Sequence, residues 1–300
     1  MTAAVAEEAL GRADRMVVAM ARLTARLRPR PDLIGGATPL AHLAGLLAKA
    51  VYAPALAVLG SQGRLGPAHL GWLGQEDAAL LADGPHVPYD LPTIFTWVLS
   101  GRFAIWIGPA QIDRLGNTNI SRIGPAARPR PALVGSRGLP DDSVSLPAGL
   151  YYTTQHGPRS VVAAVDFVSG VGDRRRLPAG SGARGRPAYL VTDLGVFDFG
   201  DADGGMRVVA RMPGIAAAEI AAATPFPLAA RATPTVAPPT GAERRALAAL
   251  DPLGVRALEC VRDAAEAAAL RRSVRAREEA ELAPRAAVFL EGLGLGEVAP

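Results

Sequence analysis

The stretch GPAQIDRLGNTNIS at residues 108–121 is the most informative part of this chain, because it joins a strand end to a polar turn. It follows the apolar run FAIWI (103–107), which is typical of a strand covered on both faces. Four polar side chains surround the glycine of this turn: Gln111, Asp113, Asn117 and Asn119. Such turns are rich in donors and acceptors, and α/β sheets bind ligands at the carboxyl ends of their strands. The residues alone leave a ligand-binding loop and a purely structural turn equally favoured.

A second glycine-containing loop follows another apolar run, PALVG (131–135). It consists of Gly135, Ser136, Arg137 and Gly138. Glycine lets the backbone approach a ligand closely and direct amide hydrogens at an anion or a developing oxyanion. Short glycine loops are common, so this loop gains weight only in combination with residues 108–121.

Helical and strand patterns alternate outward from these loops. The predicted helices are 6–27, 39–51 (with Thr38 as N-cap), 91–100, 215–224 and 241–283. The predicted strands are 55–60, 103–108, 131–135, 150–154, 160–168, 188–193, 195–199 and 206–212. This order predicts a large α/β sheet with an antiparallel part in its second half.

Composition excludes several classes of protein. The chain has 300 residues, a formal charge of +4 and 5% aromatic residues, and its arginines are scattered, so we expect no nucleic-acid partner. Cys260 is the single cysteine, and His42, His69 and His86 have no partners at metal spacing, so we expect no disulfide and no metal. No targeting segment is present, and the apolar runs are shorter than the roughly 20 residues that span a bilayer. We therefore expect a cytoplasmic protein without membrane contact.

Several motifs of this sequence occur in the same order as in a known protein family. GPAQIDRLGNTNIS followed by LVGSRG resembles the β subunits of glutaconate and 3-oxoacid CoA-transferases, which have a G-[GA]-x-Q-[IV]-D-x-x-G-N-x-N segment before a glycine-rich loop. Other matches occur in the same order: YAP (52–54), TQHGPRSVVAAVDFVSGVG (154–172), VTDLGVFDF (191–199), MRVVARMPGIAAAEIAAATPF (206–226) and DPLGVR (251–256). The resemblance covers about residues 33–256.

This resemblance implies a CoA-transferase (NagB/RpiA-like) three-layer α/β sandwich, with a mostly parallel sheet, antiparallel strands and a helical C-terminal extension. With the helical patterns at both ends and the Pro/Thr-rich composition of 224–240, it predicts an N-terminal helix (1–32), a CoA-transferase-like α/β domain (33–223), a Pro-rich linker (224–240) and a helical extension (241–300). It also implies an α-type partner subunit in an α2β2 heterotetramer, an acyl-CoA substrate, and no cofactor apart from the coenzyme A of that substrate.

The family's nucleophile is absent from this sequence. In the transferases a glutamate, about nine residues after the Tyr of the YAP segment, attacks the thioester; counting from Tyr52 reaches Ser61. A serine cannot simply replace a carboxylate, because its hydroxyl needs an adjacent base. Glu76 is the only glutamate between Glu8 and Glu219, and it reaches this position only if the loop is shifted. The loop residues Asp77, Asp83 and Asp90 are similar candidates.

The missing glutamate makes the chain similar to the β subunits of ring-opening acyl-CoA hydrolases of steroid degradation, which also lack it. That resemblance implies that the α subunit supplies a catalytic glutamate. We predict an oxyanion loop at Gly135, Ser136 and Gly138, and contacts with substrate or CoA from Gln111, Asp113, Asn117, Asn119, Arg137 and His156. Arg137 replaces a usual glycine, and either binds a substrate carboxylate or CoA phosphate or lies on the surface. Three functions stay open: CoA transfer, hydrolysis of a keto-acyl-CoA in steroid or aromatic catabolism, and a non-catalytic structural or regulatory subunit.

Overall fold

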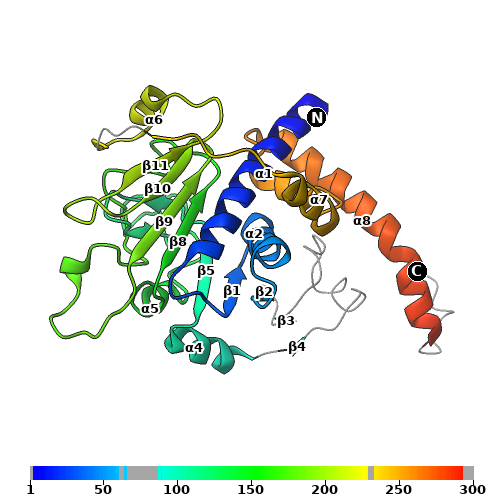
Figure 1. Cartoon of the computed structure of the whole chain (residues 1–300), viewed down its shortest axis with the longest axis horizontal. Coiled ribbons are helices and arrows are strands. Elements are labelled where there is room, and N and C mark those ends of the chain that lie inside the picture. Colours follow the sequence, from blue (N-terminus) through cyan, green and yellow to red (C-terminus); the bar gives the residue numbers. More distant parts are fainter. Residues whose placement is uncertain (1–2, 61–63, 66–86, 89, 229–232, 293–300) are drawn as a thin grey trace.

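The computed structural model describes residues 3–60, 64–65, 87–88, 90–228 and 233–292, which form a layered α/β structure (Figure 1). The strands of the main sheet are β1 (Leu33–Gly36), β2 (Ala57–Gly60), β3 (Arg64–Leu65), β4 (Val87–Pro88), β5 (Phe103–Ile107), β8 (Gly149–Thr153), β9 (Pro187–Thr192), β10 (Gly195–Asp198) and β11 (Arg207–Arg211). A separate hairpin consists of β6 (Gln111–Ile112) and β7 (Thr118–Asn119). The helices are α1 (Ala3–Arg26), α2 (Pro39–Val51), α4 (Leu91–Ser100), α5 (Leu139–Ser145), η1 (Arg174–Arg176), α6 (Ala217–Ala223), α7 (Gly241–Leu250), η2 (Val255–Glu259) and α8 (Ala264–Gly292).

The strand order of the main sheet is β11-β10-β9-β8-β5-β1-β2-β3-β4. The five central strands, from β9 to β2, are parallel to one another, and the strands at both edges are antiparallel. The predicted α/β sheet is confirmed, and antiparallel strands flank both of its sides. From β1 the chain passes through α2 to β2 on one side, and it later returns to β5 on the other. The carboxyl ends of β1 and β5 thus form a topological switch point, where open α/β sheets bind ligands.

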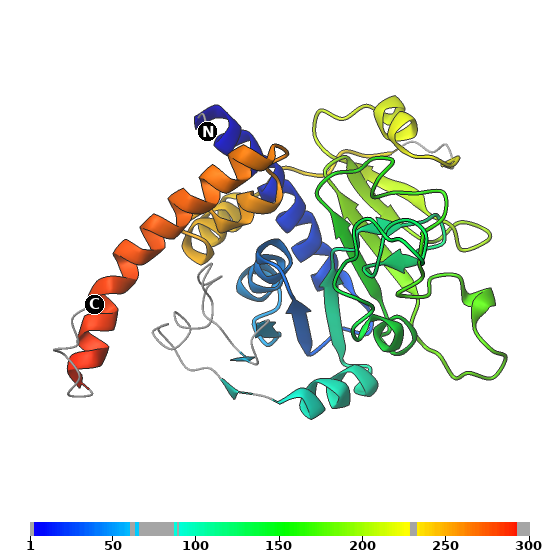
Figure 2. The same ribbon diagram turned by 180° about the vertical axis from the view of Figure 1, so that it is seen from behind.

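Alternating side chains of the central strands fill a core on each face of the sheet. On β8, Leu150 and Tyr152 pack in the large core with α1 and α2, whereas Tyr151 between them packs in a second core with Ile112 of the hairpin. Successive side chains of a strand point to opposite faces, so this alternation places helices on one face and the hairpin on the other. Figure 2 shows the sheet from the hairpin side.

Local signals explain the helical layer. Thr38 caps α2, since its side chain accepts a hydrogen bond from the backbone N–H of Ala41, and Pro39 occupies the first turn. The predicted helices at 6–27, 39–51 and 91–100 are confirmed as α1, α2 and α4. In the described part of the chain, no helix is long and apolar enough to span a membrane.

Two predicted strands are wrong. Residues 131–135 contain Pro131, which lacks an N–H, and they pair with the chain only through the bridge between Arg122 and Ala132. Residues 160–168 bridge β6 only at Val161, and the backbone then turns away. Apolar composition suggested strands at both places, but neither segment reaches the main sheet, so both remain loops over the hairpin face.

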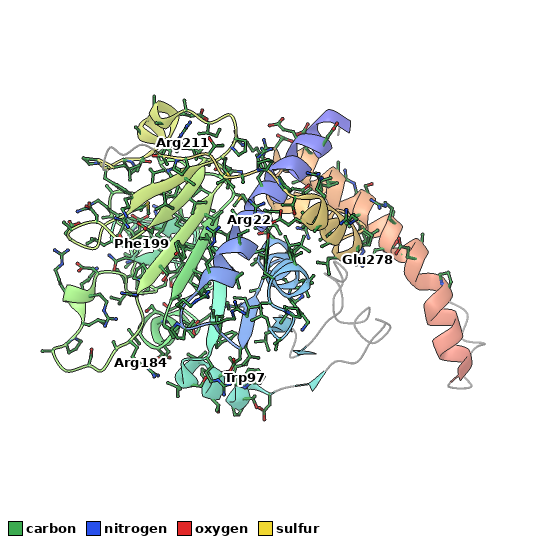
Figure 3. The ribbon with its side chains drawn as sticks, viewed as in Figure 1. Arg22, Trp97, Arg184, Phe199, Arg211 and Glu278 are labelled. Atoms are coloured by element: carbon green, nitrogen blue, oxygen red, sulfur yellow. The ribbon has the colours of Figure 1, made fainter. Side chains whose placement is uncertain are left out.

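Residues after the Pro-rich segment return to the helical layer. Thr240 and Glu243 form a capping box at the start of α7, and Glu243 also pairs with Arg22 at 2.8 Å. Figure 3 shows Arg22 on α1. Side chains of η2 and the residues after it join the large core with α1 and α2. The distal half of α8 extends away from this body in both views (Figures 1 and 2).

Candidate functional site

The candidate site begins at the carboxyl end of β5. Gly108 lies directly over Tyr152, since a Cβ at this glycine would be 2.9 Å from the tyrosine ring. Only a residue without a side chain lets the backbone pass there. The chain then enters β6, and the backbone N–H of Ala110 donates to the carbonyl of Asn119 on β7. The sequence stretch 108–121 therefore forms a hairpin that starts beside the switch point of the sheet.

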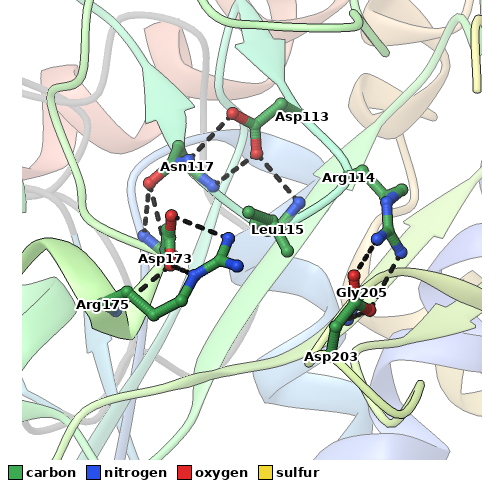
Figure 4. A network of polar contacts seen from close by, with 9 residues as sticks. Asp113, Arg114, Leu115, Asn117, Asp173, Arg175, Asp203 and Gly205 are labelled. Carbon is green, nitrogen blue, oxygen red and sulfur yellow. Dashed lines mark hydrogen bonds and ion pairs between the residues drawn. The ribbon is translucent and has the colours of Figure 1, made fainter.

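Asp113 and Asn117 join the turn of this hairpin to a distant loop (Figure 4). The Asp113 carboxylate accepts hydrogen bonds from the backbone N–H groups of Leu115 and Asn117, both at 3.0 Å, and from Asn117 Nδ2 at 2.9 Å. Asn117 Oδ1 accepts from the N–H groups of Gly172 and Asp173 at 3.0 and 3.1 Å. Burial raises the pKa of Asp113, and the bonds from Asn117 and Leu115 act against that shift.

Gln111 and Asn119 form the second polar pair of the hairpin. Asn119 Nδ2 donates to Gln111 Oε1 at 2.8 Å and to the carbonyl of Arg122 at 2.7 Å. Gln111 makes two bonds with Asp166, because its Nε2 donates to that carboxylate and its Oε1 accepts from the Asp166 backbone N–H. Asn119 Oδ1 accepts from the N–H of Ser121.

The four polar residues of the hairpin thus hold neighbouring loops together. All four are buried, with exposed fractions of 8% or less. Each has hydrogen bonds to the protein, so the geometry agrees with the structural turn that the sequence allowed as one of two interpretations. Direct contact of these side chains with an acyl-CoA stays a prediction.

A serine cluster connects the hairpin to the second loop. Ser121 Oγ lies 2.9 Å from Ser136 Oγ and 2.7 Å from Ser169 Oγ. The carbonyl of Ser121 also accepts from the backbone N–H of Leu133. These contacts attach the glycine-containing loop to the buried hairpin at both the side-chain and the backbone level.

The loop at 135–138 has an unusual backbone. Gly135 has a φ of 83° and Arg137 a φ of 48°, both in the left-handed region, and Gly138 precedes the first turn of α5. In the part of the chain that the structure describes, no hydrogen bond involves the backbone N–H groups of Ser136, Arg137 and Gly138. Successive N–H groups in such conformations form an anion-binding concavity. Because no hydrogen bond among the described residues uses these amide groups, they are available to a ligand.

His156 lies at the carboxyl ends of β8 and β9. Its Nδ1 is 3.2 Å from Thr192 Oγ1, and its Nε2 is 3.0 Å from Thr224 Oγ1. Because the Thr224 hydroxyl donates to the Ile220 carbonyl, it accepts from His156, which assigns the proton to Nε2. Burial lowers the pKa of His156 to about 4, so the ring is neutral at pH 7. Both ring nitrogens are thereby engaged within the protein.

Several sequence candidates for the nucleophile fall outside the described residues. These are Ser61, Glu76, Asp77 and Asp83. The described part of β2 ends at Gly60, beside the carboxyl end of β1. Asp90 is described, and it caps α4 by accepting from the backbone N–H of Thr93 at 3.0 Å.

Asp142 is a candidate that no sequence pattern indicated. This half-buried residue lies in the first turn of α5, and its carboxylate would be 3.6 Å from a Cβ at Gly138. Burial, with a smaller contribution from Asp141, raises the pKa of Asp142 to about 6. The Asp-Asp pair after the glycine loop was visible in the sequence, but its burial depends on the packing of α5.

Glu259 was also missed. It comes from η2, and its carboxylate accepts from the N–H of Leu40 at 2.7 Å and from the Tyr152 hydroxyl at 2.9 Å. Tyr152 also contacts the hydroxyl of Thr38 at 2.5 Å. Burial raises the pKa of Glu259, and the bond from Leu40 acts against that shift. A carboxyl group from the C-terminal part thus lies at the switch point, where no sequence motif indicated one.

Among the described residues, no three His, Cys, Asp or Glu side chains are grouped as metal ligands.

The chain resembles proteins of known activity over most of its length. It is 34% identical to the cholesterol ring-cleaving hydrolase IpdB subunit of Mycobacterium tuberculosis over 195 residues, which is 65% of this chain and 76% of that protein. It is 30% identical to a glutaconate CoA-transferase subunit of Acidaminococcus fermentans over 38% of this chain and 44% of that protein. No protein-family model matches the sequence.

Solved structures share the fold. The crystal structure of Rhodococcus jostii RHA1 IpdAB has a TM-score of 0.73 and 28% identity, and the match covers 83% of this chain and 97% of that chain. The decarboxylase AibA/AibB has a TM-score of 0.68 and 28% identity, and the match covers 82% of this chain and 96% of that chain.

The sheet, the hairpin and these similarities define an α/β enzyme subunit of the CoA-transferase fold. The chain belongs to the class I CoA-transferase family, as a β-type subunit. Within that family it is similar to the ring-cleaving hydrolase subunits.

Proposed function

We propose that this chain is the β-type subunit of a two-subunit enzyme that hydrolyses an acyl-CoA, opening a ring or cleaving a C–C bond next to a keto group. The observation that carries this proposal is the 34% identity to a cholesterol ring-cleaving hydrolase subunit over 76% of that protein. Ser61, at the position where the transferases have glutamate, supports hydrolysis over transfer. The similarity to IpdAB and AibA/AibB supports an α-type partner, and we propose an α2β2 complex.

In the proposed mechanism, this chain forms one wall of the acyl-CoA cleft. The free N–H groups of Ser136, Arg137 and Gly138 stabilise the oxyanion that develops on the thioester or ketone oxygen. Gln111 and Asn119 hold the hairpin that positions this loop through the Ser121 contact. The partner subunit supplies the carboxylate that acts as acid, base or nucleophile.

Co-purification with the α-type subunit and an assay with acyl-CoA esters test this proposal. We expect a cyclic keto-acyl-CoA to take up one water and form a ring-opened acyl-CoA with a new carboxylate, without any added acid acceptor and without release of free CoA. Hydroxylamine or borohydride trapping distinguishes transfer from hydrolysis, because a transferase forms a glutamyl-CoA thioester on its β chain. A trapped CoA adduct on this chain would contradict the hydrolytic mechanism.

The internal use of the hairpin's polar side chains favours a second candidate, a structural or regulatory subunit without catalytic residues. Asn117 and Gly135 distinguish the two candidates. Asn117→Ala removes the support of the loop, and Gly135→Ala strains the loop itself, because Gly135 has a φ of 83° that a residue with a Cβ rarely adopts. If the assembled complex keeps wild-type turnover with both variants, the catalytic role of this loop is wrong and the structural candidate gains support.

A further inference from the structure

Asp142 on α5 has a carboxyl group that the protein itself does not use. Among the residues described by the structure, no hydrogen bond or ion pair involves this side chain. Neither of its carboxylate oxygens is among the side-chain atoms that are fully enclosed without a hydrogen bond, so both are accessible. Polar groups in protected positions nearly always have a hydrogen-bond partner. The partner of this carboxyl group therefore comes from water or from a ligand.

The carboxyl group of Asp142 lies beside the glycine loop of residues 135–138. One of its oxygens would be 3.6 Å from a Cβ at Gly138, and the Asp142 N–H donates to the Gly138 carbonyl at 2.9 Å, which places the two residues one helical turn apart. Within the described ranges, the N–H of Gly138 has no hydrogen bond. The carboxyl group is thus adjacent to an amide group that the proposed mechanism assigns to the oxyanion.

Contacts on both sides of Asp142 fix the orientation of α5. The hydroxyl of Ser143 accepts from the Val171 N–H at 3.0 Å. The carbonyl of Val144 accepts from the two N–H groups of residues 184–185, both at 2.9 Å. Side chains of a helix point back toward its N-terminus, so the Asp142 carboxyl group is directed toward the loop that precedes α5.

A fully buried tyrosine is a neighbour of Asp142. Tyr151 of β8 is 1% exposed, and its hydroxyl has no hydrogen bond in the described segments. Burial and, to a smaller extent, the charge of Asp142 raise the pKa of Tyr151. The tyrosine is therefore neutral, and it does not compensate a charge on Asp142. These surroundings favour the protonated carboxyl group, which has a hydrogen to donate.

Charged groups near α5 do not compensate an ionised Asp142 either. Asp141 is exposed, and its charge adds to the effect of burial in raising the pKa of Asp142. α4, which packs against α5, contains no charged residue. The charged side chains of the other adjacent segments bond elsewhere or lie in solvent: Arg137, Asp173, Arg174, Arg175, Arg184 and Arg186. An uncompensated carboxylate is unfavourable in a half-buried position, and such groups concentrate at functional sites.

We propose that Asp142, in its acid form, donates a hydrogen bond to the oxyanion that binds at the glycine loop, beside the amide groups of residues 136–138. A carboxylic acid that stays neutral in a protected site can act as such a donor. Water adds to the keto carbon, the carbonyl electron pair moves onto the oxygen, and the partner subunit's carboxylate takes the proton of the water. The proton of Asp142 stays on Asp142 throughout. This inference rests on the proposed function, because it requires that the oxyanion forms at this loop.

The pH dependence of ring opening by the assembled α–β complex tests this inference. The wild-type turnover should fall as the pH rises through about 6, because the ionised carboxylate has no hydrogen to donate and repels the oxyanion. Asp142→Asn keeps a neutral donor, so its turnover should lie within about 3-fold of the wild type at pH 5.5 and exceed it by at least about 10-fold at pH 8. Ratios of variant to wild type at each pH cancel the titration of the partner subunit.

A variant without a donor separates the hydrogen bond from the charge. Asp142→Leu has a similar size and should lose about 100-fold in kcat at pH 5.5, with little change in KM, as the loss of one oxyanion donor predicts. Gel filtration and urea denaturation check that each variant assembles and folds, and Asp142→Ala takes the place of the leucine variant if that one does not assemble.

Asp141→Asn is the matched control, since it removes the same charge from the adjacent, exposed residue. It should leave the turnover at pH 5.5 unchanged. It should also lower the midpoint of the pH profile slightly, because Asp141 contributes to the raised pKa of Asp142.

Two outcomes would overturn the inference. If Asp142→Leu matches Asp142→Asn at every pH, Asp142 donates no hydrogen bond to the oxyanion. If Asp142→Asn keeps the wild-type decrease above pH 6, another group causes that decrease. In both cases the complex still opens the ring, so the hydrolytic function stands. A wild-type complex that converts no acyl-CoA would instead contradict the proposed function, and this inference with it.

Discussion

Asn117 illustrates how single residues build this site. Its side chain satisfies the Asp113 carboxylate and two backbone N–H groups, at Gly172 and Asp173. A buried amide that loses such partners costs about 1–3 kcal/mol for each group left unsatisfied. The polar motif that identified the family therefore contributes first to the stability of the loops, and through them to the position of the glycine loop.

The single carboxyl group of Asp142 makes the free energy of unfolding depend on pH. Its pKa is raised to about 6 by burial, whereas an aspartate in the unfolded chain titrates near 3.8. Folding therefore favours the protonated carboxyl group, and this contribution is present below pH 4 and lost as the pH rises through 6. We expect Asp142→Asn to increase the free energy of unfolding by about 1–3 kcal/mol at pH 7.5 and by much less at pH 4.

Urea denaturation of the wild type and Asp142→Asn at both pH values measures this difference. Asp141→Asn is the matched control, since Asp141 is exposed and adjacent in sequence. An equal effect of Asp142→Asn at pH 4 and pH 7.5 would show that the pKa of Asp142 does not differ between the folded and the unfolded protein.

At the level of elements, a buried polar cluster joins α1, near the N-terminus, to α7, near the C-terminus. Glu243 of α7 accepts from Arg22 of α1, from the Tyr52 hydroxyl after α2, and from the N-cap Thr240. Its side chain is fully buried, and Arg22 is 17% exposed. Burial would raise the pKa of Glu243, but the bonds from Arg22, Tyr52 and Thr240 outweigh it and hold the pKa at about 2.

Replacing Glu243 should therefore be costly. We expect Glu243→Ala to decrease the free energy of unfolding by about 3–5 kcal/mol at pH 7, because Arg22 is left with an uncompensated charge. Since the folded pKa is depressed, the difference from the wild type should shrink as the pH falls from 4.5 towards 2.

The surface pair of Arg275 and Glu279 on α8 provides the control. Both side chains are exposed, at 64% and 66%, so Glu279→Ala should change stability by less than about 0.5 kcal/mol. Chemical denaturation followed by circular dichroism compares the two variants. Equal effects would mean that the α1–α7 contact does not contribute to the cooperative fold.

At the scale of the whole molecule, the C-terminal part completes the core of the sheet. Glu259 reaches Tyr152 and Leu40 at the switch point, and Arg262 pairs with Asp193 after β9 at 2.9 Å. The segment 253–262, which contains both residues, therefore joins the carboxyl ends of β1, β8 and β9. Its apolar residues are buried with α1 and α2: Leu253, Val255, Ala257, Cys260 and Val261.

Two truncations separate this segment from the long helix. Ending the chain after Asp263 removes α8, of which Val274 is the buried apolar residue in the described side chains, and should leave a cooperative fold. Ending it after Asp251 also removes the five buried residues named above and should prevent folding, since each buried apolar side chain contributes roughly 1.5–3 kcal/mol. Thermal unfolding of the two chains would refute this division if both unfold alike.

Local features of the sequence predicted most elements because they depend on near neighbours. The Thr38-Pro39 start of α2 and the apolar run of β5 were identified from their own residues. The strands expected at 131–135 and 160–168 are absent because apolar composition does not specify a pairing partner. In the same way, the resemblance identified the hairpin and the glycine loop, but not whether their polar side chains face a ligand or the interior.

The sequence by itself indicated the family and the order of the main elements, since motifs and periodicity are linear properties. The replacement of the family's glutamate by Ser61 stays a prediction from spacing. Only the tertiary structure decided that the polar hairpin is buried and that Arg137 has a positive φ, with no hydrogen bond or ion pair of its side chain among the described residues. It also decided that Asp142 and Glu259 are half-buried acids with raised pKa values near the loop and the switch point. Burial, backbone strain and the choice of hydrogen-bond partner depend on residues that are far apart in the chain, and folding alone brings them together.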